Sequence, residues 1–261
     1  AQDAIVQLRP YADKLNEIQA SVCAALRDTE TENIYAQRKK GNGKVLIVVV
    51  TSNKGLCGAF NANVLRETRR IMDERYSQEN SRGDLGVMTV GKKANDALRK
   101  LKCNIIEDQS DLYTELTFDR ISALADKLMR LYVSKEYDTI EIVYNQFKNA
   151  AVQKLTNEVF LPVTMGTISG QDSAPADYIY EPDQVRIISE LIPKTLRIKL
   201  YRSLLDSFAA EHGARMTAMH QATDNATELI RDLTLQYNKA RQASITNQLL
   251  EVVSGAEALN G

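Results

Sequence analysis

Apolar positions at the C-terminal end of the chain recur at alternating steps of three and four residues, which is typical of a coiled-coil seam. The stretch from Lys194 to about Leu259 contains no proline. At 1.5 Å per residue, such a helix is roughly 100 Å long. A compact domain formed by residues 41–183 would have a radius of gyration of only about 15 Å. We therefore expect the helix to project beyond its own domain rather than lie along it. The predicted seam consists of Met219, Ala222, Ala226, Leu229, Leu233, Gln236, Ala240, Ala243, Asn247 and Leu250.

The N-terminal end of the chain, residues 1–40, carries the same spacing. Its predicted seam consists of Ala4, Leu8, Tyr11, Leu15, Ile18, Val22 and Ala25. Pro10 interrupts this helix and removes one backbone donor. Because each helix alone would expose its seam, we expect the two ends to pair as an antiparallel coiled coil, with residues 184–261 as the second helix. The chain begins inside this pattern without a methionine, so we expect the N-terminal helix to be truncated.

Between the two helical ends, apolar runs alternate with segments of helical spacing. The run Val45–Val50 is apolar on both faces, as a strand of a parallel sheet requires. Strands that alternate with helices predict an α/β layer fold. The expected strands are 44–51, 85–90, 104–107, 139–147 and 155–163, and the expected helices are 60–76, 92–101 and 118–133. We therefore predict a Rossmann-like α/β domain over residues 41–183, inserted between the two long helices.

Composition excludes several classes of protein. The chain has 33 Lys and Arg against 34 Asp and Glu, and its net charge of −1 argues against an electrostatic footprint for nucleic acid. The longest apolar run, Val45–Val50, is far too short to span a bilayer. Cys23, Cys57 and Cys103 are isolated in the sequence, so neither a zinc site nor a disulfide framework is indicated.

The turn Ser52–Gly58 is the strongest candidate for an enzymatic site. A glycine-containing turn that opens a helix can hold a phosphate on its backbone N–H groups. However, the turn matches neither of the two common phosphate-binding motifs, and its glycines are also explained by a tight turn. His212 and His220 lie about 12 Å apart along one helix, too far to share a metal. We predict no catalytic, cofactor or metal residues, and an α/β nucleotide-binding enzyme with a dimerising coiled coil stays open as an alternative.

The last twenty residues form a nearly uncharged tip. From Gln242 onwards the only charged residues are Glu251 and Glu257. An apolar stripe runs along this segment through Ile245, Leu249, Leu250, Val252, Val253, Ala256 and Leu259. Because an exposed helix end does not normally carry such a stripe, something is expected to cover it. The cover is expected to be missing N-terminal residues of this chain, an apolar collar in another protein, or both, because a pair of helices would still need shielding.

Several segments resemble the γ subunit of F-type ATP synthases, and the resemblance covers nearly the whole chain. The matching segments are Ser52-Asn-Lys-Gly-Leu-Cys-Gly58, Arg215-Met-Thr-Ala-Met219, Ala222-Thr-Asp-Asn-Ala226 and Tyr237-Asn-Lys-Ala-Arg-Gln-Ala-Ser-Ile-Thr246. The chain departs from the family pattern at Asn53, where Asp is usual, and at Gln248, where Glu is usual.

The resemblance implies a central rotor shaft that couples transmembrane proton flow to ATP synthesis or hydrolysis. Catalysis would belong to a surrounding hexamer of α and β subunits, and this chain would bind no cofactor, nucleotide or nucleic acid. Further implied partners are the ε subunit and the membrane c-ring, at the cytoplasmic face of the bacterial inner membrane. By the same resemblance, Arg241, Gln242 and Thr246 contact the β subunit. Tyr178 and Glu181 would form a foot near the membrane ring and ε.

Overall fold

The structure is a computed structural model that describes residues 10–11, 14, 34–35, 43–149, 152–163 and 184–260, with only the backbone at 184–189 and 257–260. The chain divides into two compact units, Ala1–Met216 and Thr217–Gly261. The predicted division into segments 1–40, 41–183 and 184–261 stays a prediction.

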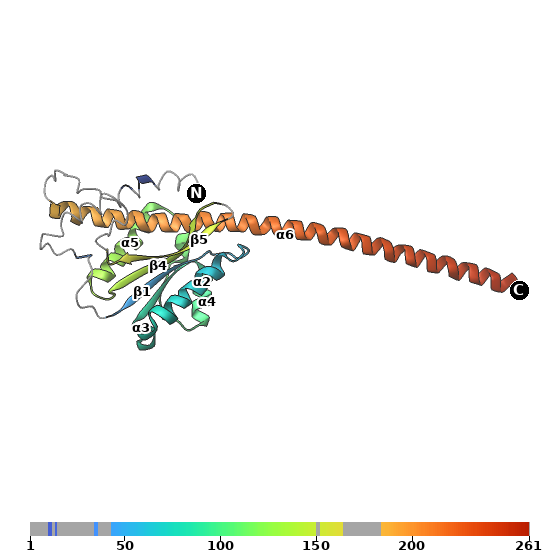
Figure 1. Ribbon diagram of the computed structural model, residues 1–261, viewed down its shortest axis with the longest axis horizontal. Coiled ribbons are helices and arrows are strands. Elements are labelled where there is room, and N and C mark those ends of the chain that lie inside the picture. Colours follow the sequence, from blue (N-terminus) through green and yellow to red (C-terminus); the bar gives the residue numbers. More distant parts are fainter. Residues whose placement is uncertain are drawn as a thin grey trace, which may run out of the picture. The chain divides into compact units, whose positions relative to one another are not determined.

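The first unit contains a five-stranded mixed sheet with the strand order β3-β2-β1-β4-β5. Four strands are parallel, and β5 pairs with β4 in the antiparallel sense (Figure 1). The strands are β1 (Val45–Val50), β2 (Leu85–Val90), β3 (Ile105–Asp108), β4 (Thr139–Phe147) and β5 (Gln153–Leu161). Both faces of β1 and β2 are buried, which explains why their sequences are apolar without alternation.

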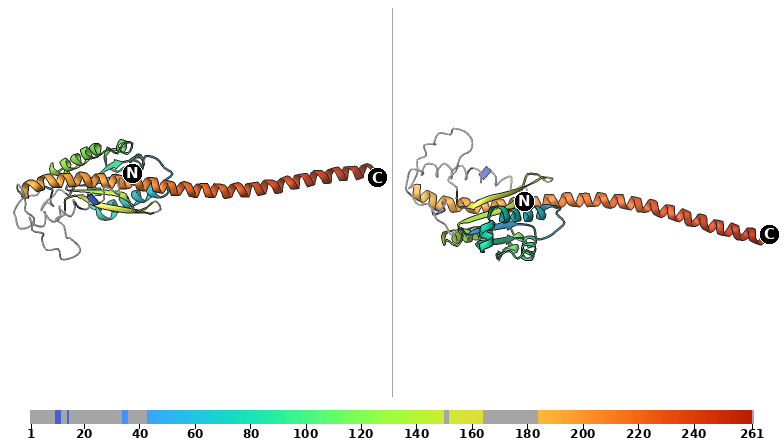
Figure 2. Two further views of the ribbon diagram at one scale, coloured as in Figure 1. Left: turned by 90° about the horizontal axis from the view of Figure 1, so that it is seen from above. Right: turned by 60° about the horizontal axis from the view of Figure 1, so that its bottom comes forward.

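Helices cover both faces of this sheet. They are α2 (Phe60–Arg70), the π-helical turn η1 (Ile71–Arg75), α3 (Ser77–Arg82), α4 (Lys92–Lys100), the 3₁₀ turn η2 (Ser110–Tyr113), α5 (Phe118–Val133) and α6 (Gln184–Asn260). Successive side chains of a strand point to opposite faces. Accordingly, Leu46 and Val48 pack with α5 and α6, whereas Val45 and Ile47 pack with α2 and α4. The sheet is therefore the middle of three layers (Figures 1 and 2).

The predicted α/β fold and its long C-terminal helix are confirmed, and the predicted strands and helices between residues 44 and 163 lie within about two residues of the observed ones. Two observed elements, α3 and η2, are not among the elements predicted from the sequence. Helix α6 begins ten residues before Lys194 and includes Pro193. A proline inside a helix removes one backbone hydrogen bond, a small loss in a helix of 77 residues.

The expectation that the long helix does not lie along its own domain is wrong for its first part. Ile192, Leu196, Leu200 and Leu204, spaced by four residues, are buried in the core between the sheet and α5. An ion pair between Arg197 and Asp126 of α5, at 2.7 Å, joins the same two helices. Residues four apart share one face of a helix, so this row of apolar side chains is a core face.

The predicted pairing with the N-terminal helix lies almost entirely outside the described residues. Pro10, Tyr11 and Lys14 are described and are helical. Tyr11 is 57% exposed, so this predicted seam position is not buried in the structure.

A buried carboxylate connects η1 to strands β4 and β5 of the sheet. Glu141 of β4 is fully buried, and its carboxylate lies 2.9 Å from the guanidinium of Arg75. The Tyr76 hydroxyl donates to the same carboxylate at 2.5 Å, and the Asn157 side chain donates to it at 2.9 Å. The π-helical turn brings Arg75 and Tyr76 together at this carboxylate, which therefore links one helical layer to two strands.

Replacing Arg75 with Gln is expected to lower the free energy of unfolding of the first unit by about 2–3 kcal/mol, because a charge-assisted bond to a buried carboxylate is lost. The measurement is urea unfolding followed by near-UV circular dichroism. The matched control is Arg70→Gln, which removes ion pairs to Glu67 and Glu74, whose side chains are 18% and 66% exposed rather than fully buried, and is expected to change little. Equal effects of the two substitutions would mean that the Glu141 cluster contributes no special stability.

Candidate functional site

The turn Ser52–Gly58, at the carboxyl end of β1, is held from inside by a small polar network. The backbone N–H of Ser52 donates to Asn61 at 3.0 Å, and the Ser52 hydroxyl donates to the carbonyl of Lys54 at 2.5 Å. Asn61 also donates to the sulfur of buried Cys57 at 3.1 Å. These bonds stabilise the turn in one conformation, which exposes 76% of Leu56 to solvent.

Asn53 connects the same turn to the helical segments that follow β2 and β3. Its amide oxygen accepts from the backbone N–H of Lys92, at the start of α4, at 2.9 Å. Its amide nitrogen donates to the carbonyl of Ser110, in η2, at 3.1 Å. An aspartate could accept the first bond but could not donate the second. The departure from the family pattern at Asn53 therefore has a structural use in this chain.

Arg215 of α6 forms hydrogen bonds to the turn Ser52–Gly58. Its guanidinium donates to the carbonyls of Lys54 and Gly55, at 3.3 and 3.2 Å, and pairs with Glu211 at 2.7 Å. Glu211 is one helical turn away and almost fully buried, so it fixes the orientation of the arginine. The sequence reading placed Arg215 in a matching segment but did not predict this contact. The four-residue spacing between Glu211 and Arg215 could have indicated their ion pair. No sequence pattern indicates the contact of Arg215 with the distant turn.

The crevice where an open α/β sheet usually binds a ligand is filled by side chains. Such ligands bind at the carboxyl ends of the strands, where the strand order reverses, here between β1 and β4. A buried apolar cluster occupies this end of the sheet and consists of Cys57, Phe60, Phe147, Leu205, Ala209 and Ala210. Half of these side chains belong to α6. The packing gives a physical reason to expect no nucleotide here, although the expectation itself stays a prediction.

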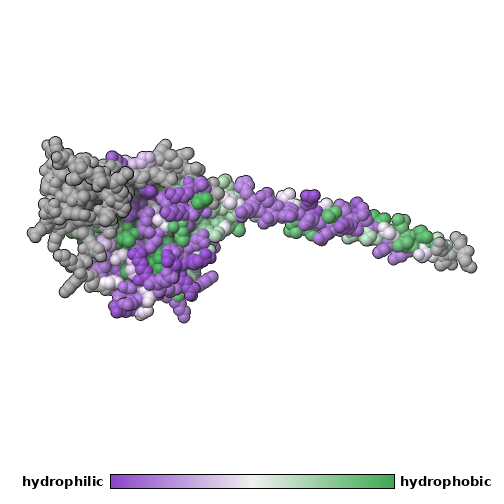
Figure 3. Space-filling model, viewed as in Figure 1, coloured by the Kyte–Doolittle hydropathy of each residue, from purple (hydrophilic) through white to green (hydrophobic). Residues whose placement is uncertain are grey.

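In the second unit, α6 exposes almost every side chain. From Met219 to Ala256 all described side chains are exposed except Asn238, which is half-buried. Apolar residues gather towards the C-terminal end, where Ile245, Leu249, Leu250, Val252 and Val253 are 49–69% exposed (Figure 3). Ala256 is also exposed, and the side chain of Leu259 lies outside the described residues. The predicted apolar stripe is therefore uncovered in the described part of the chain.

Arg241, Gln242 and Thr246 are exposed just before this stripe. At 3.6 residues per turn, all three lie on the side of the helix that also carries Ile245 and Leu249. The hydroxyl of Thr246 donates to the carbonyl of Gln242 at 2.9 Å. Its hydrogen is thus used within the helix, and the oxygen can only accept a bond from a partner. Tyr178 and Glu181, the predicted foot, lie outside the described residues, so their placement stays a prediction.

The described part of the chain contains neither a metal-binding cluster nor a membrane-spanning helix. No group of three His, Cys, Asp or Glu residues there is arranged to hold a metal ion. Among the described residues, no helix combines the length and the apolar composition that a membrane crossing requires.

Comparisons with known proteins agree with the fold. A family model described as ATP synthase matches residues 1–259. The ATP synthase gamma chain of Christiangramia forsetii is 49% identical over 261 residues, which cover 100% of this chain and 88% of that protein. The gamma chain of Flavobacterium johnsoniae is 48% identical with the same coverage. A chain from the mitochondrial ATP synthase of Euglena gracilis has the same fold, with a TM-score of 0.64 and 20% identity over 99% of this chain and 93% of that one. The chain therefore belongs to the family of ATP synthase γ chains.

Proposed function

We propose that this chain is the central shaft of an F-type ATP synthase and couples proton flow to ATP synthesis or hydrolysis by rotation. The observation that carries the proposal is the exposed apolar stripe at the end of one continuous helix, α6. A soluble protein rarely leaves such a stripe uncovered unless a partner covers it. An apolar collar formed by α and β subunits suits it, because such a collar covers the helix while a ring of neutral side chains lets it turn.

The shaft is a non-catalytic subunit. The usual ligand crevice of its sheet is filled by side chains, half of them from α6, and its glycine turn is fixed by Asn61 and Arg215. ATP chemistry then takes place on the surrounding hexamer, and this chain acts by changing the conformations of the hexamer's sites. The alternative, an α/β nucleotide-binding enzyme, would need an open crevice at the same place.

Asymmetry is the physical basis of the coupling. A single chain has no three-fold symmetry, so catalytic sites placed around it meet different faces of the helix. The helix can shift a catalytic site from one conformation to another only if its contacts with that site differ between the two conformations. Rotation exchanges the faces in sequence and so drives each site through its conformations in turn.

Particular contacts are part of the proposal, and they rest on the resemblance to the γ family. Arg241, Gln242 and Thr246 contact loops of the β subunit where α6 enters the collar. Tyr178 and Glu181 lie at the opposite end, near the ε subunit and the membrane c-ring. The complex stands at the cytoplasmic face of a bacterial inner membrane, and this chain is peripheral to it.

Co-purification tests the proposal. A tagged chain is expected to bring down a complex with six larger subunits and to show ATP turnover only within it. Lys54→Ala, in the glycine turn, serves as the control and is expected to leave that turnover intact. Stoichiometric ATP hydrolysis by the isolated chain, abolished by Lys54→Ala, would instead establish the enzyme.

A further inference from the structure

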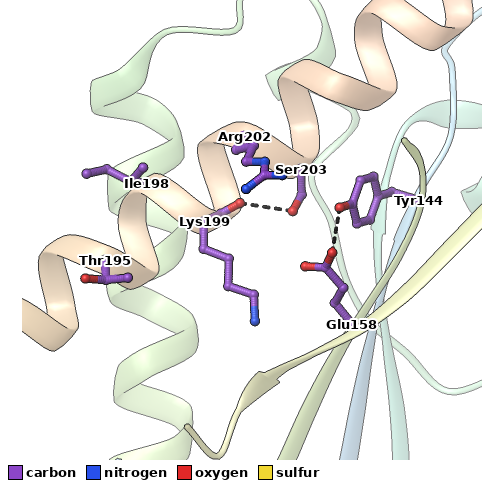
Figure 4. Close-up of a pocket in the computed structure, with 7 residues that line it drawn as sticks. All are labelled: Tyr144, Glu158, Thr195, Ile198, Lys199, Arg202 and Ser203. Carbon is purple, nitrogen blue, oxygen red and sulfur yellow. Dashed lines mark hydrogen bonds between the residues drawn. The ribbon is translucent and has the colours of Figure 1, made fainter. Parts of the chain in front are cut away.

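A pocket of about 270 Å³ lies within the first unit, between α6 and the sheet (Figure 4). Its lining comes from α6 and from strands β4 and β5, and it includes two residues of opposite charge, Lys199 and Glu158. At about 30 Å³ per water molecule, the pocket has room for roughly nine waters. Because sites for drug-sized ligands begin at about 300 Å³, this volume suits a small polar molecule.

Lys199 of α6 brings a cation with unused donors into the pocket. Its ammonium donates to the carbonyl of Val159 at 2.7 Å. An ammonium has three N–H donors, and this bond uses one of them on an uncharged acceptor. Burial, the largest effect, lowers the pKa of Lys199. An anionic group at the remaining donors would therefore stabilise the charged form of this side chain.

Glu158 of β5 brings unused acceptors into the same pocket. Its carboxylate accepts from the Tyr144 hydroxyl at 2.9 Å (Figure 4). The two oxygens of a carboxylate offer about four acceptor positions, so others remain for a donor. Against the larger effect of burial, Glu158 raises the pKa of Lys199 through its charge and not through a hydrogen bond. In the described part of the chain, the ammonium and the carboxylate thus line one pocket without forming an ion pair.

We propose that this pocket binds a small amino acid as its zwitterion, with the ligand's carboxylate on Lys199 and its ammonium on Glu158. Such a ligand places each of its charges beside the opposite charge of the lining, as electrostatic complementarity requires. The zwitterion is neutral as a whole, so its binding needs no excess of either charge in the pocket. Arg202, which also lines the pocket, has its own interactions within the protein and takes no part in this recognition. The site involves no partner subunit, so the full chain alone suffices to test it.

Equilibrium dialysis of the purified full chain against radiolabelled glycine tests the site. Saturable binding of one glycine per chain is expected. Lys199→Met keeps the apolar stem without the charge, and Glu158→Gln keeps the shape of the carboxylate. Each is expected to weaken binding about tenfold or more, because a charge-assisted hydrogen bond to the ligand is lost. Lys194→Met is the matched control, since Lys194 is an exposed lysine on the same helix, and it is expected to leave the affinity nearly unchanged. Circular dichroism verifies that each variant is folded.

Two half-ligands separate direct recognition from a general effect on the structure. Acetate carries only the carboxylate and methylamine only the ammonium, so each is expected to bind about tenfold or more weakly than glycine. Lys199→Met should weaken acetate more than methylamine, and Glu158→Gln should weaken methylamine more than acetate. The proposal is wrong if no saturable glycine binding occurs, if either half-ligand binds as tightly as glycine, or if either variant binds glycine like the unchanged chain. Equal losses for both half-ligands in each variant would also contradict it.

Discussion

Gly91→Ala is expected to lower the free energy of unfolding of the first unit by more than about 4 kcal/mol, at the upper end for single substitutions. Gly91 has φ +111°, and a Cβ atom at this position would lie 2.1 Å from the carbonyl oxygen of Thr51. The obstacle is backbone of the neighbouring strand end, which cannot rotate away as a side chain does. The backbone N–H of Thr51 donates to Val90 at 2.8 Å, and its hydroxyl accepts from the backbone N–H of Ala94 at 2.8 Å. Moving Thr51 would therefore break the contact between β1 and β2 and the start of α4.

Gly83→Ala is the matched control for this prediction. Gly83 also has a positive φ, +80°, but a Cβ atom there would meet nothing within 4 Å. Only the backbone strain remains, which costs an L-residue about 1–2 kcal/mol. The measurement is the urea midpoint of each variant, together with hydrogen exchange of the β1 amides. Similar losses at both positions would show that the steric contact with Thr51 does not determine the stability.

Much of the sheet is predictable from the sequence because its strands obey local rules. Val45–Val50 is apolar at every position and so has to be buried on both faces. The helix Phe118–Val133 shows its buried face as apolar residues three and four apart. By contrast, α3 (Ser77–Arg82) contains no buried residue. A short polar helix has no apolar period to reveal it.

The length of α6 alone does not reveal that its first part lies in the core, whereas its apolar pattern does. Leu196, Leu200 and Leu204 show the four-residue spacing of a core face. The length of the whole helix indicates that part of it projects from the domain. It does not indicate which part. A helix of this length can pack one part of itself in a core and expose another.

Some parts of the candidate site are likewise predictable from the sequence, and others are not. The apolar tip was predicted from a local signal, the loss of charge after Arg241. The attachment of the Ser52–Gly58 turn by Arg215 joins segments 160 residues apart in the chain, and no local pattern reveals it. A pocket in the first unit likewise combines Glu158 of β5 with Lys199 of α6 (Figure 4). The roles of Arg241, Gln242 and Thr246 rest on resemblance, because their partners are other chains.

Replacing both Arg241 and Gln242 with Leu is expected to lower ATP hydrolysis by the assembled complex about tenfold or more. A neutral hydrogen bond contributes about 0.5–1.5 kcal/mol and a charge-assisted one about 1.5–3 kcal/mol. Loss of both kinds in one rotary position therefore removes at least about 2 kcal/mol, and about 1.4 kcal/mol corresponds to a tenfold change in rate. Because both side chains are exposed in the second unit, the substitutions should leave the helix itself intact.

Lys239→Leu is the control for this double variant, since it also removes an exposed cation from α6, two residues earlier. It is expected to leave turnover nearly unchanged, because at 100° per residue its side chain points about 160° away from Arg241 and about 60° away from Gln242. Single-rotor recordings should show altered dwell times at particular angles only in the double variant, since a bond made in one rotary position affects that position alone. Thr246 should contribute less than either residue, because its hydroxyl hydrogen already bonds within the helix. Normal turnover and unchanged dwells in the double variant would mean that apolar packing of the tip alone guides the shaft.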